Sequence, residues 1–106
     1  MTTVIIDPEA ERMREEFIQR MEDLNYFPTA IQTFQNEVEA ILDQIEDLPQ
    51  GRQPHGDKID KELGTLSFPP SKTFKIRVRF RLIDNGKTAR VVFIGTTRQI
   101  IEDLPN

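Results

Sequence analysis

The stretch K-I-R-V-R-F-R-L-I at residues 75–83 carries a positive charge at every second position. Strict alternation predicts a β-strand, because successive side chains of a strand point to opposite faces. One face of this strand would be apolar, and the other would carry a cationic row: Lys75, Arg77, Arg79 and Arg81. Such a row can bind the phosphates of a nucleic acid without reading its sequence.

The cationic row has two other interpretations. A solvated sheet face must be polar, and Lys or Arg on an exposed strand discourages edge-to-edge aggregation, although a face of mixed charge would serve solubility better. The row could instead pair with carboxylates, either on the first predicted helix or on a partner chain. The residue pattern leaves all three interpretations open.

Charge is unevenly distributed along the 106 residues, whose formal net charge is -4. Residues 1–57 contain four basic and thirteen acidic side chains, whereas residues 58–98 contain ten basic and three acidic ones. The low overall charge therefore hides a basic second half, and we expect an electrically two-sided domain.

The composition excludes several classes of chemistry. The absence of cysteine rules out disulfides, cysteine-ligated zinc and a cysteine nucleophile, and it is typical of the reducing cytosol, so we predict a cytoplasmic protein. No apolar run approaches the ~20 residues of a membrane span, and no signal peptide or membrane anchor is predicted. The acidic residues of the first predicted helix have no convergent ligands, so neither a metal nor a cofactor is expected.

The elements that would position the cationic row follow from periodicity. Thr3–Ile6 is a short β-branched run, and Asp7-Pro8 predicts the capped start of a helix over 8–24. Apolar residues at three- and four-residue spacings predict a second helix over 28–48, antiparallel to the first. Pro- and Gly-rich residues 49–57 read as a loop.

Three strands are predicted in the second half, over 63–68, 73–83 and 89–94, with Asn85-Gly86 as a hairpin turn between the last two. The order is β-α-α-β-β-β in a single domain, 1–106. We therefore predict an α+β fold in which a helical hairpin packs on one face of a small, mostly antiparallel sheet. The cationic row would lie on the other face, which the helices leave uncovered.

Two segments give the chain a recognisable resemblance. V-I-I-D-P-E-A-E, followed by a helical hairpin and then by F-K-I-R-V-R-F-R-L-I-D-N-G-K-T-A-R-V-V-F-I-G-T-T-R, resembles the RelE/ParE family of toxins from type II toxin–antitoxin systems. The resemblance covers nearly the whole chain in element order, and residues 49–72 match poorly. It implies a toxin that an antitoxin protein wraps and holds inactive, with oligomers of the two possible.

The family contains two activities. RelE-like members are endoribonucleases that cut mRNA at the ribosome and so inhibit translation, whereas ParE-like members inhibit DNA gyrase. For the RelE-like activity the resemblance implies attack by the RNA's own 2′-hydroxyl, with cations stabilising the transition state. It places the catalytic cations at Arg77, Arg79 and Arg98, and RNA-binding cations at Lys72, Lys75, Arg81, Lys87 and Arg90.

The chain departs from the RelE pattern at one point. RelE-like enzymes usually carry a Tyr or His near the C-terminus for proton transfer, but the single Tyr here is Tyr26 and the single His is His55. RNA cleavage is therefore one of three hypotheses. The others are a ParE-like gyrase inhibitor and a non-catalytic relative that acts as a binding or regulatory protein.

Overall fold

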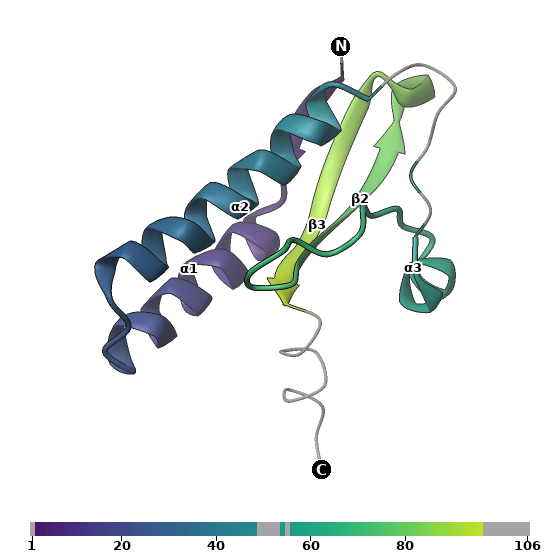
Figure 1. Cartoon of the computed structure of the whole chain (residues 1–106). Coiled ribbons are helices and arrows are strands. Elements are labelled where there is room, and N and C mark those ends of the chain that lie inside the picture. Colours follow the sequence, from purple (N-terminus) through teal and green to yellow (C-terminus); the bar gives the residue numbers. More distant parts are fainter. Residues whose placement is uncertain (1, 49–53, 55, 97–106) are drawn as a thin grey trace.

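The structure is a computed structural model that describes residues 2–48, 54 and 56–96. It is an α+β fold, as predicted, with long helices on one side of a small sheet (Figure 1). The elements are β1 (Thr3–Ile6), α1 (Pro8–Asp23), α2 (Pro28–Glu46), α3 (Lys58–Leu63), β2 (Ile76–Ile83), the 3-10 turn η1 (Asp84–Gly86) and β3 (Thr88–Thr96).

Helices α1 and α2 form the predicted antiparallel hairpin (Figure 1). Each begins at a proline, which suits the first helical position because that backbone N–H has no helical partner to lose. Asp7 stands at the N-cap of α1 but makes no side-chain cap hydrogen bond. Its carboxylate accepts instead from Arg90 Nε at 2.6 Å, which ties β3 to the start of α1.

The sheet is mixed, with strand order β1-β3-β2. Strand β3 lies in the centre, antiparallel to β2 and parallel to β1, so the predicted antiparallel hairpin of the last two strands is confirmed. A parallel pairing needs a long crossover connection, and both helices and β2 lie between β1 and β3 in the chain. The register places Arg81 directly opposite Arg90, and Arg79 opposite Phe93.

The core lies between the helical hairpin and the sheet. The alternate residues Ile76, Val78 and Phe80 of β2 are buried, as the period-2 pattern predicts. The Phe17 and Phe34 rings stack with centroids 4.5 Å apart, which locks α1 against α2. Burying these large apolar side chains supplies most of the driving force for folding.

Two predicted strand assignments are wrong. The segment expected as a strand over 63–68 pairs only through a single bridge, Leu66 to Phe80, and it follows the short helix α3, which was not predicted. The strand expected from residue 73 begins at Ile76, because Lys75 takes a left-handed φ of 53° that interrupts the extended backbone.

A carboxylate on α2 shapes the turn before β2. One oxygen of Glu37 accepts hydrogen bonds from the Ser71 hydroxyl and from the backbone N–H groups of Thr73 and Phe74, at 2.5, 3.2 and 3.1 Å. Burial by itself would raise the pKa of Glu37, but these hydrogen bonds lower it by more. The charged form therefore anchors the turn to α2.

Candidate functional site

The short helix α3 is built around two aspartates. Asp57 is its N-cap and Asp60 its third residue, and each carboxylate accepts the other's backbone N–H at 2.9 Å. This reciprocal arrangement is a capping box, which satisfies two donors that the helix start would otherwise leave unpaired. Gly64 ends the helix with a left-handed φ of 70°, a conformation that costs glycine little.

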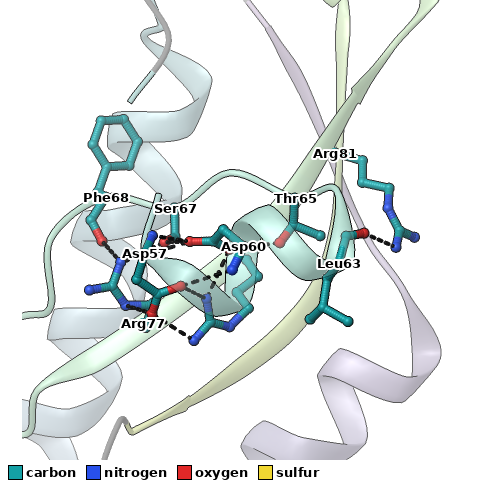
Figure 2. Close-up of polar contacts among 9 residues, drawn as sticks. Asp57, Asp60, Leu63, Thr65, Ser67, Phe68, Arg77 and Arg81 are labelled. Carbon is teal, nitrogen blue, oxygen red and sulfur yellow. Dashed lines mark hydrogen bonds and ion pairs between the residues drawn. The ribbon is translucent and has the colours of Figure 1, made fainter. Parts of the chain in front are cut away.

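Helix α3 lies next to β2, on the side of the sheet away from the helical hairpin, where the cationic row was expected to be open (Figures 1 and 2). Arg79 donates from Nη1 and Nη2 to the two oxygens of Asp57, at 2.7 and 3.1 Å. Its Nη1 also lies 2.9 Å from Asp60 Oδ1. The Arg79 side chain is 1% exposed and its guanidinium lies 5.4 Å from the centre of the Phe93 ring, so it is enclosed on both sides.

Arg77 completes an arginine–aspartate cluster of four side chains: Arg77, Arg79, Asp57 and Asp60. Its Nη1 donates to the Ser67 hydroxyl at 2.6 Å and to the Phe68 carbonyl at 3.1 Å (Figure 2). Its Nε is buried without a hydrogen bond and lies 3.4 Å from Asp57 Oδ2. Both guanidinium groups therefore pair with groups of the same chain, on α3, its N-cap and the segment that follows the helix.

Asp60 is the most buried carboxylate of the cluster, with 1% of its side chain exposed. The hydroxyls of Thr65 and Ser67 both donate to it, Thr65 at 2.6 Å. Burial by itself would raise the pKa of Asp60, but hydrogen bonds from Ser67, Thr65, the Asp57 backbone and Arg79 together lower it by more, so the net shift is downward. The Asp60 carboxylate is therefore ionised, and both of its oxygens have partners within the chain.

The remaining pKa shifts in the cluster agree with this geometry. Hydrogen bonds from Arg79 hold the pKa of Asp57 well below its usual range, against the opposing effect of burial. Burial by itself would lower the pKa of Arg79, but hydrogen bonds to Asp57 and Asp60 raise it overall. All three groups stay charged at neutral pH, and the two aspartates neutralise the two arginines.

The prediction of an uncovered cationic row is thus wrong for its two central members. Arg77 and Arg79 are buried among carboxylates, which matches the alternative in which the row pairs with acidic groups. The acidic groups, however, belong to α3 and not to the first helix. The physical reason is that α3 brings Asp57 and Asp60 over β2, so the second face of the sheet is covered where Arg77 and Arg79 lie.

The other predicted site residues do not join the cluster. Lys72, Lys75 and Lys87 are exposed, and Arg81 is exposed with Nη2 donating to the Leu63 carbonyl at 3.0 Å. Arg90 pairs with Asp7, and this hydrogen bond raises the pKa of its guanidinium. Arg98 and His55 lie outside the described residues.

Asp57 and Asp60 were missed as site residues, although the sequence contains a signal for them. Acidic residues three apart, followed by an apolar residue and a glycine, fit the start and stop of a short helix. Thr65 and Ser67 add polar side chains at alternate positions within an otherwise apolar run. Such a pattern indicates a face that contacts polar groups rather than a core.

The described residues contain no group of three or more His, Asp or Glu side chains placed to hold a metal ion. None of the described helices is both long and apolar enough to cross a membrane. Comparison with protein-family models, curated proteins and solved structures finds no significant match. Membership of the RelE/ParE family therefore stays a prediction from the sequence segments that resemble it.

Proposed function

We propose that this chain is a RelE/ParE-like protein that acts by binding another protein, and that it does not cut RNA. The proposal depends on the pairing of Arg77 and Arg79 with Asp57 and Asp60. Phosphoryl-transfer catalysis needs cations that are free to stabilise charge developing on the substrate. Here two of the three arginines expected for that task are already neutralised by carboxylates of the same chain.

The positions of the proton-transfer candidates give further support. Tyr26 lies in the turn between α1 and α2, whereas the cluster joins β2 to α3 and its N-cap. Figure 1 shows this turn at the end of the helical hairpin that is farthest from α3. A general acid or base must lie within hydrogen-bond reach of the reacting group. Tyr26 therefore cannot serve a reaction at Arg77 and Arg79.

A RelE-like mRNA endoribonuclease is the second candidate, and one observation favours it. Lys72, Lys75 and Arg81 are exposed on the segment that leads into β2 and on β2 itself, so this part of the surface retains some positive charge for an RNA backbone. A ParE-like gyrase inhibitor is compatible with protein binding and needs no free guanidinium. In all three cases a cognate antitoxin would be the natural binding partner.

The decisive experiment separates cleavage from binding. The chain is expressed in bacteria without a partner, transcript ends are mapped, and the purified chain is added to a reconstituted translation system and to a gyrase supercoiling assay. We expect intact mRNA and no new transcript ends. Cleavage that disappears in the double variant Lys75→Ala, Arg81→Ala would overturn the proposal in favour of the nuclease, and loss of supercoiling would identify gyrase as the bound protein.

A further inference from the structure

Helix α3 is attached to the sheet by polar contacts rather than by apolar packing. The hydrophobic core that the described residues form takes in Leu66 and Phe68 but no residue of α3. Of the two apolar side chains of α3, Ile59 is half-buried and Leu63 is 50% exposed. The short helix therefore lacks the apolar burial that holds α1 and α2 on the sheet.

The contacts that hold α3 are hydrogen bonds and ion pairs. Arg79 bonds Asp57 and Asp60, and Arg81 donates to the Leu63 carbonyl at the other end of the helix (Figure 2). When an ion pair separates, both ions regain their hydration, which offsets much of the lost attraction. Segments that bury few apolar groups open at a lower free energy than the core does. We therefore expect α3 to leave the sheet more readily than the rest of the fold unfolds.

The segment that follows α3 is fixed to β2. Leu66 exchanges two backbone hydrogen bonds with Phe80, at 2.8 and 2.9 Å, and the Phe68 ring stacks on the Phe80 ring with centroids 6.3 Å apart. Gly64 lies between α3 and this segment, with a φ of 70° and nothing within 4 Å of the position that a Cβ would take. Because rotation about a glycine meets little steric resistance, Gly64 can serve as the hinge.

The two buried arginines differ in which side of Gly64 holds them. Within the described residues, the hydrogen bonds and ion pairs of Arg79 go to carboxylates of α3 and its N-cap. Arg77 Nη1 instead donates to the Ser67 hydroxyl and the Phe68 carbonyl, both on the fixed side of the glycine. Departure of α3 would therefore free the guanidinium of Arg79, while Arg77 would keep two of its hydrogen bonds.

We propose that α3 is a latch that opens about Gly64 while the helical hairpin and the sheet stay folded, and that its opening uncovers Arg79 but not Arg77. In the closed form the α3 carboxylates occupy Arg79. In the open form Arg79 joins Arg81, which is already exposed, on the second face of the sheet. The latch is an autoinhibitory contact for any interaction that needs Arg79. This inference goes beyond the proposed function, which concerns the closed form.

Amide hydrogen exchange of the unmodified full chain, followed by NMR in low urea, tests the hinge without any variant. The backbone N–H groups of Asp60, Lys61 and Thr65 all donate to acceptors on α3 or its N-cap. We expect their protection factors to be at least about tenfold below those of Leu66 and Phe80 and nearly independent of urea, as for a local opening. One common protection factor for all five amides would overturn the inference, because α3 would then open only with the sheet.

Labelling of arginines with phenylglyoxal, read by mass spectrometry of peptides, tests which guanidinium is uncovered. In the parent chain we expect fast labelling of Arg81, slow labelling of Arg79 and the slowest labelling of Arg77. Asp57→Asn should speed the labelling of Arg79 by about tenfold or more, because the open form becomes more populated. The control is Glu62→Gln, which removes the charge of an exposed acidic residue of α3 and should leave all three rates unchanged. Circular dichroism verifies that both variants fold.

Two labelling results would overturn the inference: equal rates for Arg77 and Arg79, or an unchanged Arg79 rate in Asp57→Asn. Both experiments use the chain alone, so their outcome is independent of the RNA-cleavage assay. Intact RNA with an α3 that never opens alone removes only this inference. Local opening of α3 together with cut RNA removes only the proposed function.

Discussion

Arg79 on β2 donates hydrogen bonds to both carboxylate oxygens of Asp57, from Nη1 at 2.7 Å and from Nη2 at 3.1 Å. Asp57 lies 22 residues earlier in the chain. Two parallel charge-assisted hydrogen bonds fix the relative orientation of the two groups as well as their separation. The pair therefore positions α3 on the sheet. The same pair removes from solvent a guanidinium that the sequence pattern would assign to a bound phosphate.

Removing Arg79 should destabilise the fold strongly. Arg79→Met keeps much of the side-chain volume but leaves the buried Asp60 without its cation, so we expect the free energy of unfolding to fall by about 3–5 kcal/mol. Urea unfolding measures the change. Arg12→Met is the control, because Arg12 pairs with Glu9 on the exposed surface of α1, and its loss should change stability by no more than about 0.5 kcal/mol. Equal effects of the two variants would contradict a structural role for the cluster.

Stability should fall in acid because of the same cluster. The pKa values of Asp57 and Asp60 are lowered in the folded chain from an ordinary value of 3.8, so the unfolded chain binds protons first as the pH falls. The contribution of these groups is fully present above about pH 5 and is lost below pH 4 as the pH approaches their folded-state pKa values. Urea midpoints between pH 7 and pH 2.5 measure it.

The matched variant for the acid transition is Asp57→Asn, which should be less stable at pH 7 and show a shallower loss between pH 4 and pH 2.5. Asp60 and Glu37 also have lowered pKa values, so a reduced acid dependence remains in this variant. Parallel curves for the parent chain and Asp57→Asn would show that Asp57 does not contribute to the transition.

Periodicity predicted the parts of this fold that are local. The proline starts and apolar stripe of α2 and the alternation of β2 repeat within a few residues, so each element could be read from its own sequence. The parallel pairing of β1 with β3 joins residues about 85 apart, such as Ile5 and Arg90, and no local pattern encodes it.

The environment of the cationic row could not be read from the alternation. A strand with one polar face has the same pattern whether that face meets water or a covering helix with carboxylates. The deciding contacts come from Asp60 in a six-residue helix and from Asp57 at its N-cap, and the helix lies between Pro- and Gly-containing segments. Helices this short have too few residues to show a period, so neither α3 nor its position over Arg79 was predicted.

A methyl group at Gly56 should disturb α3. A Cβ there would lie 2.5 Å from the Asp60 Cβ and 2.6 Å from Asp60 Oδ2, closer than side-chain atoms pack. Because Asp60 is held by Thr65, Ser67 and Arg79, it cannot move without breaking hydrogen bonds, and Gly56→Ala should cost about 1–3 kcal/mol of stability.

The comparison for Gly56 is Gly86, in the η1 turn, where a Cβ meets nothing within 4 Å and the strain comes from a φ of +84° alone. Gly86→Ala should cost about 1–2 kcal/mol. The two variants differ most clearly in amide chemical shifts: only Gly56→Ala should perturb α3 and residues 65–67. Unchanged shifts there, with unchanged stability, would show that α3 accommodates the methyl group.

Truncation of two phenylalanines of the helical hairpin should change the free energy of unfolding by very different amounts. Phe34 is fully buried, stacks on Phe17 and meets the edge of Phe74 at 5.9 Å between ring centroids, so Phe34→Ala should remove about 3–5 kcal/mol of stability. Phe27 is 79% exposed, so Phe27→Ala should change stability by no more than about 0.5 kcal/mol. Urea unfolding of both variants measures the difference. A large loss for Phe27→Ala would mean that its ring stabilises the turn.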